Sequence, residues 1–295
     1  AAMAQYVLDP SLPFQRKVID FVDVDSDKWQ QYSIQKRWPM SWIYRREGDL
    51  LLQFERDVAR QFDAGLFVSS SEADMFKALA PESAHKVGFY NNGVNSAYFA
   101  PDETLPNPYA AEEKALVFTG AMDYWPNIDA VTWFARELFP TLRSQSPDLR
   151  FYIVGSSPAK TVSQLADLPG VTVTGRVEDV RPYLQHALAA VAPMRIARGV
   201  QNKVLEAMAM EKPVIVTAKG LEGIDAEHDE HVLLAETASD YLSSLQRVLE
   251  DDCSGLGQRA RQRISGHFNW DSNLPEVVYL LTGPPTLEAG DKASA

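Results

Sequence analysis

Residues 188–216 read LAAVAPMRIARGVQNKVLEAMAMEKPVIV, and this stretch decides the fold. Two short apolar runs, LAAVAP (188–193) and VIV (214–216), have the length of buried strands, and a helical segment lies between them at 202–210. A strand, a helix and another strand in this order form one unit of a parallel sheet. The stretch therefore predicts an α/β fold.

The same alternation runs through the chain from about residue 114. Further strands are predicted at LVF (116–118), FYIV (151–154), VTV (171–173) and, more weakly, HVLLA (231–235). Helical segments alternate with them at 127–144, 159–167, 179–187, 239–250 and 256–266. Right-handed crossovers place the carboxyl ends of such strands, with their loops, along one ligand-binding edge.

The first hundred residues contain less regular structure. Strands are predicted at KVIDFVDV (17–24), AGLFVS (64–69) and KVGFYN (86–91), with one long helix near 47–62. Three strands with few crossovers make a poor domain alone, so we interpret 1–108 as the second half of a domain whose beginning is absent. A Pro-rich acidic linker is predicted at 99–113, a Rossmann-like domain at 109–267 and a disordered tail at 283–295.

The composition excludes several function classes. The 295 residues carry a formal net charge of −12, which disfavours tracking along nucleic acid. No apolar run approaches the roughly 20 residues of a spanning helix, and no signal peptide is visible. The single cysteine, Cys253, cannot form an internal disulfide, so a reducing cytoplasm fits. No basic amphipathic helix stands out.

Glu206 occupies an unusual place in the central helix. With Asn202 as the cap, Lys203 and Glu206 share one side of the first turns, yet Ala207 and Met210 flank the carboxylate. The helix is apolar nearly all round, which predicts that it is covered on more than one side. A carboxylate there is costly unless something pairs with it. Pairing with Lys203 alone is the structural alternative.

Cationic residues gather before and at the start of this helix. Arg195, Arg198 and Lys203 lie where the helix presents its free N–H groups, a combination that suits a phosphate or diphosphate. Glu206, one turn further, would accept hydrogen bonds from a polyol such as ribose. An anion-binding end beside a hydroxyl-binding carboxylate indicates a nucleotide site, although both arginines could instead be solvated loop charges.

Several stretches resemble a known family. FVDVDSDKWQQYS, LFVSSSEADMF, NNGVNSAYF, FTGAMDYWPNIDAV and RGVQNKVLEAMAMEKPV are similar to GT-B glycosyltransferases of family 4, group 1, in the subgroup associated with bacterial exopolysaccharide loci. The resemblance implies a complete C-terminal Rossmann-like domain plus a partial N-terminal α/β domain. It also implies that 268–282 is the closing helix that returns to the N-terminal domain.

The resemblance assigns roles within the helix and its loop. The family's ribose-binding glutamate matches Glu206, whereas its sugar-contacting glutamate falls on Arg198. The family's usual Arg and Lys after the first strand are also absent from TGAMDYWPN (119–127). We therefore expect Lys203, Arg195 and Arg198 to neutralise phosphate, with Lys203 and Arg198 stabilising the departing diphosphate during catalysis.

Other loops complete the expected donor site. Gly120 lets backbone approach the nucleotide closely, and Arg176 and Val177 are expected beside the base. Tyr124 could either stack on the ligand or pack beside its neighbours. Asp179 is predicted to cap a helix rather than to bind ligand.

On the acceptor side, Asp23, Asp25 and Lys28 follow a strand of the first domain and are candidates to face the acceptor. Helix capping by Asp25 or Ser26 is an equal alternative.

The resemblance implies a retaining, hexosyltransferase-type enzyme that moves a sugar from a UDP- or GDP-type donor to a glycan or lipid-linked acceptor. It also implies that no metal or other cofactor is needed. A cytoplasmic location is expected, and peripheral contact with the inner membrane is left open. His228 and His231 have metal-like spacing but no third ligand, which favours a surface turn.

Because part of the family's N-terminal domain is missing from this chain, we expect it to bind nucleotide weakly and to transfer little. Two alternatives remain: a sugar-nucleotide epimerase of the same fold, and a non-catalytic nucleotide- or glycan-binding protein. A dehydrogenase is disfavoured because no G-x-G-x-x-G follows a strand.

Overall fold

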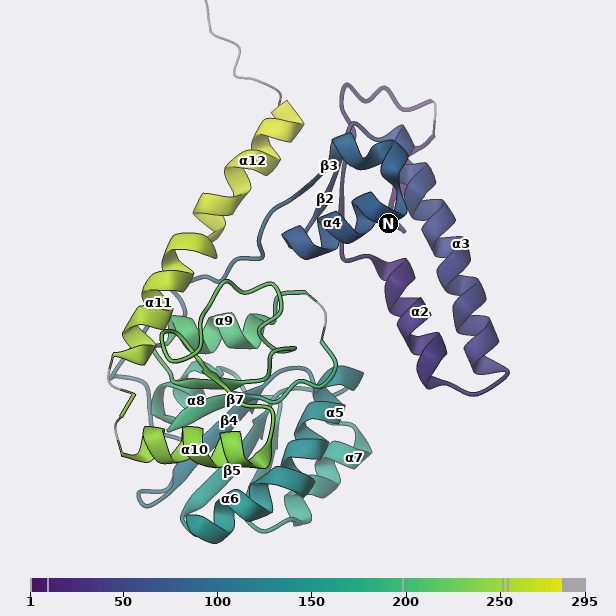
Figure 1. Ribbon diagram of the computed structural model, residues 1–295. Helices are drawn as coiled ribbons and strands as arrows, with labels where there is room; N and C mark the ends of the chain where they lie inside the picture. The colour runs from purple at the N-terminus through teal and green to yellow at the C-terminus, as the bar shows by residue number, and fades with distance from the viewer. Residues whose placement is uncertain (1, 10, 198, 251, 254, 283–295) are drawn as a thin grey trace, which may run out of the picture. The chain divides into compact units, whose positions relative to one another are not determined.

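The computed structural model describes residues 2–9, 11–197, 199–250, 252–253 and 255–282 (Figure 1). It contains two compact units, one made of residues up to Asn91 together with those from Asp271, and the other of Asn92–Trp270. We call them the first and second unit. The boundaries predicted from the sequence were 108/109 and 267/268, and the tail predicted at 283–295 lies outside the described residues.

The second unit is built on a six-stranded parallel sheet, in agreement with the predicted fold class. Its strands are β4 (Lys114–Thr119), β5 (Leu149–Val154), β6 (Val171–Gly175), β7 (Ala189–Ala192), β8 (Val214–Val216) and β9 (Leu233–Leu234). Their spatial order is β6-β5-β4-β7-β8-β9, so the chain reverses its direction of travel across the sheet between β4 and β7. Such a reversal is where open α/β sheets bind ligands.

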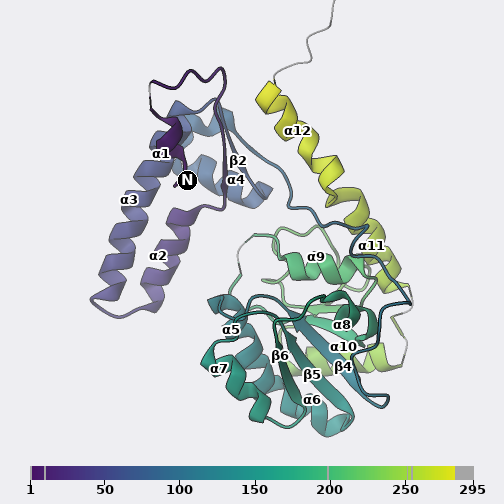
Figure 2. The same cartoon turned by 180° about the vertical axis from the view of Figure 1, so that it is seen from behind.

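Helices cover both faces of this sheet (Figures 1 and 2). They are α5 (Trp125–Trp133), α6 (Phe139–Gln145), α7 (Lys160–Ser163), α8 (Arg181–His186), α9 (Asn202–Ala209), α10 (Ala238–Leu249) and α11 (Leu256–His267). The strands need this cover because Ala115, Leu116, Val117 and Phe118 are each only 1% exposed. The single helix predicted at 127–144 is divided: a π-helical turn at Phe134–Leu138 separates α5 from α6.

The segment after Asn91 packs along the second unit. The Tyr109 hydroxyl donates a 2.6 Å hydrogen bond to the Tyr183 carbonyl, and its ring lies 4.7 Å from that of Tyr152. The side chain of His186 contacts the Leu105 carbonyl at 2.8 Å. The stretch predicted as a linker is therefore held by side-chain contacts.

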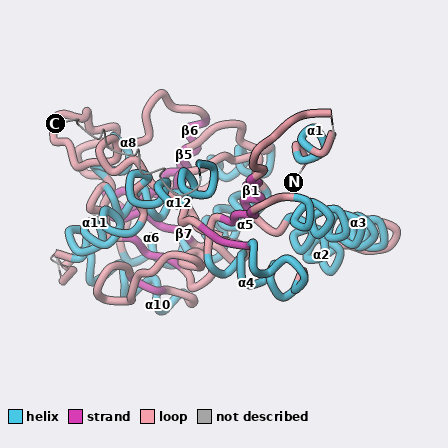
Figure 3. Tube along the Cα trace, turned by 90° about the horizontal axis from the view of Figure 1, so that it is seen from above, coloured by secondary structure: helices cyan, strands magenta, loops and turns pink. Residues whose placement is uncertain are grey.

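The first unit has a three-stranded parallel sheet in the order β1 (Val18–Val22), β2 (Ala64–Phe67), β3 (Val87–Phe89). Its helices are α1 (Ala4–Val7), α2 (Asp25–Gln35), α3 (Met40–Gln61), α4 (Ser70–Leu79) and most of α12 (Trp270–Thr282). Helices α2 and α3 run side by side as a long hairpin (Figures 1 and 2), and Figure 3 shows the same pair from above. The helix predicted at 47–62 thus begins earlier, at Met40.

Candidate functional site

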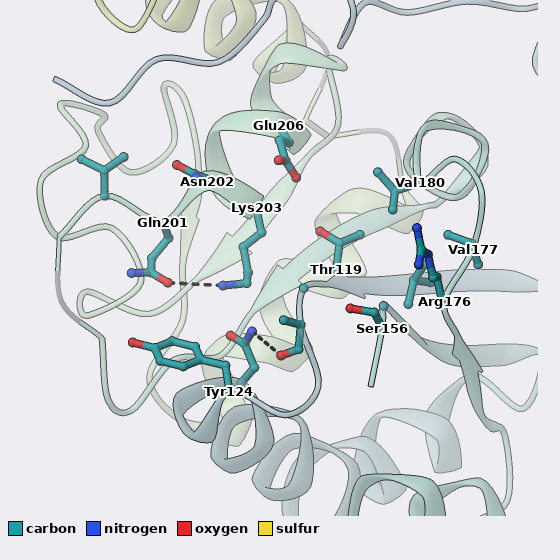
Figure 4. A pocket seen from close by; sticks show the side chains of 16 residues that line it. Thr119, Tyr124, Ser156, Arg176, Val177, Val180, Gln201, Asn202, Lys203 and Glu206 are labelled. Carbon is teal, nitrogen blue, oxygen red and sulfur yellow. Dashed lines mark hydrogen bonds between the residues drawn. The ribbon is translucent and has the colours of Figure 1, made fainter. Parts of the chain in front are cut away.

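A cavity of about 550 Å³ opens at the carboxyl ends of the strands of the second unit, at the reversal between β4 and β7 (Figure 4). The loops after β4, β5 and β6 and the beginning of α9 form its walls. Its lining residues are Thr119, Gly120, Ala121, Tyr124, Asn127, Val154, Gly155, Ser156, Arg176, Val177, Val180, Val200, Gln201, Asn202, Lys203 and Glu206. The sheet topology therefore gathers five predicted donor-site residues, Gly120, Arg176, Val177, Lys203 and Glu206, in one place.

Two glycines allow the loops after β4 and β5 to meet at the cavity floor. A Cβ on Gly155 would lie 1.7 Å from the Gly120 carbonyl oxygen, and one on Gly120 would lie 2.7 Å from the Asn127 side-chain nitrogen. Neither distance is tolerable, so both positions require glycine. The close approach observed at Gly120 is between protein segments, and the same residue lines the cavity.

The N-terminus of α9 points its backbone donors toward the cavity without a side-chain cap. The helix begins at Asn202, whose side chain is exposed, so the expected Asn202 cap is not formed; Gln201 precedes the helix and makes no side-chain capping bond. Among the described residues, the backbone N–H groups of Asn202 and Lys203 have no acceptor. Uncapped N–H groups with the positive end of the helix dipole make an anion-binding position.

Lys203 is the cation beside this helix terminus. Its Nζ donates a 3.2 Å hydrogen bond to Gln201 Oε1 and lies 5.3 Å from the centroid of the Phe118 ring (Figure 4). The side chain is partly buried, and burial lowers the pKa of Lys203 to about 8, opposed by the charge of Glu206. A charge held in such surroundings is favoured further by an anionic ligand.

Glu206 lies one turn further along α9, and Figure 4 shows its carboxylate and Lys203 extending from the same helix. In the part of the chain that the structure describes, no hydrogen bond or ion pair reaches this carboxylate, and no ion pair to Lys203 forms. Burial raises the pKa of Glu206 to about 7, with Lys203 opposing the shift. Since Lys203 donates to Gln201 and not to Glu206, the oxygens of the Glu206 carboxylate are available to a ligand.

Polar residues that the sequence interpretation did not single out also line the cavity. Asn127, 4% exposed on α5, donates from Nδ2 to the Ala121 carbonyl at 2.9 Å, while its buried Oδ1 has no partner among described residues. Ser156 and Thr119 lie at the ends of β5 and β4. The signal for all three was their position directly after buried strands or at a helix start, where loops meet.

Arg195 lies outside this cavity. Its Nε donates a 3.0 Å hydrogen bond to Asp129 of α5, and its guanidinium lies 5.3 Å from the Trp133 ring centroid. It lines a different hollow, formed along α5. Arg198 lies outside the described residues, so its predicted roles stay predictions.

The acceptor-side candidates lie at the start of α2 in the first unit, where Asp25 is the first helical residue. Neither Asp25 nor Ser26 caps the helix with its own side chain. Instead Ser26 donates from N and Oγ to the buried Glu55, at 3.3 and 2.5 Å. Asp23 lies two residues before α2, and Lys28 lies in its first turn.

Two further predictions concern turns of the second unit. Asp179 accepts the backbone N–H of Arg181, the first residue of α8, at 2.9 Å and pairs with the Arg181 guanidinium. The N-cap position itself is Val180, so Asp179 satisfies this N–H from one residue before the cap rather than as the predicted cap. His228 and His231 each accept a backbone N–H through Nδ1 and so stabilise their turn. Within the described ranges no three potential metal ligands come together.

Comparison with known proteins shows which family and which solved structures this chain is similar to. Residues 113–251 match the family described as Glycosyl transferases group 1. No curated protein matches the sequence.

Solved structures with the same fold include a sucrose-phosphate synthase from Thermosynechococcus elongatus, with TM-score 0.71 and 19% identity over 94% of this chain and 69% of that one. WaaG, a glycosyltransferase involved in lipopolysaccharide biosynthesis, gives 0.70 and 16% over 96% and 82%. Anabaena HepE in complex with UDP and glucose gives 0.68 and 14% over 96% and 82%. Residues 113–251 therefore match the glycosyl transferases group 1, and the chain has the GT-B fold of these solved structures.

Proposed function

We propose that this chain binds a nucleoside diphosphate sugar in the cavity of the second unit and transfers the sugar, with retained configuration, to a hydroxyl of a glycan or lipid-linked acceptor. The physiological setting would be bacterial exopolysaccharide or cell-surface polysaccharide synthesis at the cytoplasmic side of the membrane. The observation that carries the proposal is the meeting of Lys203, Glu206 and the uncapped N-terminus of α9 in one cavity.

The diphosphate is assigned to the start of α9. The free N–H groups of Asn202 and Lys203 would donate to phosphate oxygens, and the Lys203 ammonium would exchange Gln201 Oε1 for a phosphate. Gly120 on the opposite wall offers backbone without a side chain. An anionic ligand here offsets the cost of the partly buried ammonium.

The nucleoside is assigned to the rest of the cavity. The Glu206 carboxylate, without a hydrogen-bond partner from the described protein, would accept bonds from two ribose hydroxyls, and the base would lie against the loop of Arg176 and Val177. UDP is the first candidate because HepE, a structure of the same fold, is in complex with UDP.

During transfer the bond between the anomeric carbon and the diphosphate oxygen breaks, and the acceptor oxygen bonds to that carbon as its proton passes to the departing diphosphate. The departing diphosphate gains negative charge, which Lys203 and the α9 N–H groups would stabilise. We propose that this stabilisation makes a metal ion unnecessary. Arg198 is proposed as a second cation at the diphosphate, whereas Arg195 could join only by releasing Asp129.

Calorimetric titration of UDP, GDP and ADP into the full chain tests the site. We expect one nucleotide to be preferred and its affinity to fall at least about tenfold, or 1.4 kcal/mol, in Glu206→Ala. Glu103→Ala, an exposed carboxylate elsewhere in the second unit, is the matched control and should bind like the wild type. Equal binding by wild type and Glu206→Ala would overturn the site assignment.

Transfer itself is tested with the matching nucleotide sugar and a lipid-linked or oligosaccharide acceptor. Acceptor-dependent release of the nucleoside diphosphate that persists in excess chelator supports a metal-independent transferase. Release of an altered free sugar without acceptor would indicate the epimerase alternative instead.

A further inference from the structure

The turn between α2 and α3 has a composition unlike the rest of the chain. Residues 33–46 read SIQKRWPMSWIYRR, with four cations and no carboxylate, in a chain that holds 40 acidic and 28 basic residues. Two of the six tryptophans lie here. We call residues 34–46 the hairpin tip.

The apolar side chains of the hairpin tip face solvent. Ile34 and Trp38 are each 81% exposed and Trp42 is 60% exposed, with Met40 and Ile43 exposed beside them. Large apolar side chains that are exposed together mark an interaction surface, because a folded monomer gains stability by burying them. Neither unit's core includes these residues.

The exposure does not come from a poorly packed hairpin. A Cβ on Gly48 would lie 2.9 Å from the Gln30 side chain, so α2 and α3 approach closely, and Gln30 also donates a 2.6 Å hydrogen bond to Asp49. The rings of Trp29 on α2 and Tyr44 on α3 pack in a tilted arrangement, with their centroids 5.3 Å apart. These contacts fix the two helices together just behind the hairpin tip, which is presented as a preformed surface.

The cations of the hairpin tip are largely unneutralised by the protein. Lys36, Arg37 and Arg45 are exposed and make no ion pair with any described residue, whereas Arg46 pairs with Glu47 at 2.9 Å. Positive charge maintained on a chain of net charge −12 indicates an anionic partner.

We propose that the hairpin tip docks the first unit onto an anionic phospholipid membrane. Trp38 and Trp42 would enter the region between headgroups and acyl chains, where amphipathic rings are most stable, with Ile34 and Met40 beside them. Lys36, Arg37 and Arg45 would lie among lipid phosphates.

The observations favour a lipid surface over other anionic or apolar partners. A nucleic acid would use the cations but leave Ile34, Met40 and Ile43 exposed. A second copy of the chain would bring two sets of like charges together. The attachment is interfacial, since no helix in the described residues is long and apolar enough to span a membrane.

Co-sedimentation with vesicles tests the proposal, using the full chain with phosphatidylcholine alone or mixed with phosphatidylglycerol. We expect binding to the mixed vesicles at low salt and at least about tenfold weaker partitioning in Lys36→Gln/Arg37→Gln. Trp38→Ala/Trp42→Ala should lose binding at any salt concentration. The matched controls, Lys160→Gln and Trp125→Ala in the second unit, should partition like the wild type.

Brominated acyl chains give an independent readout, because they quench tryptophans that enter the membrane. Quenching should occur in the wild type and disappear in Trp38→Phe/Trp42→Phe, while circular dichroism shows that this variant remains folded. Equal binding to neutral and anionic vesicles, or binding that survives both double variants, would overturn the proposal. So would a dimer in sedimentation analysis that Trp38→Ala/Trp42→Ala dissolves, since a second copy would then cover the tip.

Discussion

The starts of α2 and α9 make an instructive pair. Each helix follows a strand of a parallel sheet, and each has a buried or partly buried glutamate beside its first turn, Glu55 for α2 and Glu206 for α9. Burial raises the pKa of both carboxyls. A pKa shift alone therefore does not distinguish a structural carboxylate from one that binds ligand.

Hydrogen-bond partners make the distinction. At α2 the protein closes the helix start: Glu55 accepts from Ser26 N and Oγ, and Glu72, 2% exposed, accepts the Val24 N–H at 2.7 Å. At α9 no described residue bonds to Glu206, and the first N–H groups open into a 550 Å³ cavity. One helix start is completed by its own protein, and the other is complementary to something the chain does not supply.

The largest expected effect is on protein stability, and it comes from the start of α2, where the protein supplies its own hydrogen-bond partners. Glu55→Ala removes both bonds to Ser26 and leaves buried donors unsatisfied, so we expect a loss of about 3 kcal/mol in the free energy of unfolding. Denaturant unfolding measures it, and nucleotide binding should be unchanged. Glu47→Ala, a surface carboxylate on the same helix, is the control. A loss below about 0.5 kcal/mol would show that Glu55 does not stabilise α2.

The next largest effect is expected on nucleotide binding at the start of α9, which we call the open site. Lys203→Met keeps the length of the side chain but removes its charge, so nucleotide affinity should fall by about 2 kcal/mol, or roughly 30-fold. Stability should not decrease, because the variant no longer buries an ammonium. Calorimetry and thermal unfolding together measure both, with Lys160→Met as the control. If affinity were retained, the diphosphate would lie elsewhere.

Binding at the open site should also depend on pH. The pKa of Lys203, about 8, means that the ammonium is lost as pH rises through that value, so affinity should fall up to about tenfold between pH 7.5 and 9. Below pH 7 affinity should fall again as Glu206 takes up a proton. Titrations across pH check this, and Lys203→Arg should abolish the alkaline decrease. A decrease that persists in the arginine variant would have to come from another group.

The smallest effect contrasts the free protein at two pH values. The pKa of Glu206 is raised to about 7 in the fold, so its ionisation costs stability as pH rises from about 4.5 to 7. Glu206→Gln removes that cost. The free energy of unfolding of the variant, relative to that of the wild type, should therefore be higher at pH 8 than at pH 5 by about 1 kcal/mol, a figure reduced for the remaining contact of Glu206 with water. Urea unfolding at both values measures the difference. No relative gain would mean that a protein group neutralises Glu206.

Much of the second unit could be predicted from the sequence. Its strands are short apolar runs buried on both faces, and a run such as LVF (116–118) signals burial whatever its neighbours are. The local sequence pattern also predicted α9 and the unusual apolar surroundings of Glu206. By contrast, the break between α5 and α6 and the early start of α3 at Met40 were not predicted, because the pattern at those points is continuous or mixed.

The hairpin tip was missed for a related reason. Its cations and tryptophans lie on both sides of a turn between two helices, so no single helix shows a basic amphipathic pattern. The tip becomes one surface only when α2 and α3 pack together. Arg195 is a similar case, because its hydrogen-bond partner Asp129 lies 66 residues away in the chain and cannot be predicted from the local sequence.

The sequence by itself determined the parallel α/β architecture and the order of its elements, because burial patterns and helix-forming segments are local properties of the chain. It also determined that Lys203 and Glu206 share one face of a helix. Only the tertiary structure decided which charges are satisfied: Glu55 by Ser26, Arg195 by Asp129, and Glu206 by no described residue. Partners of charged side chains come from distant segments, and their identity depends on the packing that brings those segments together.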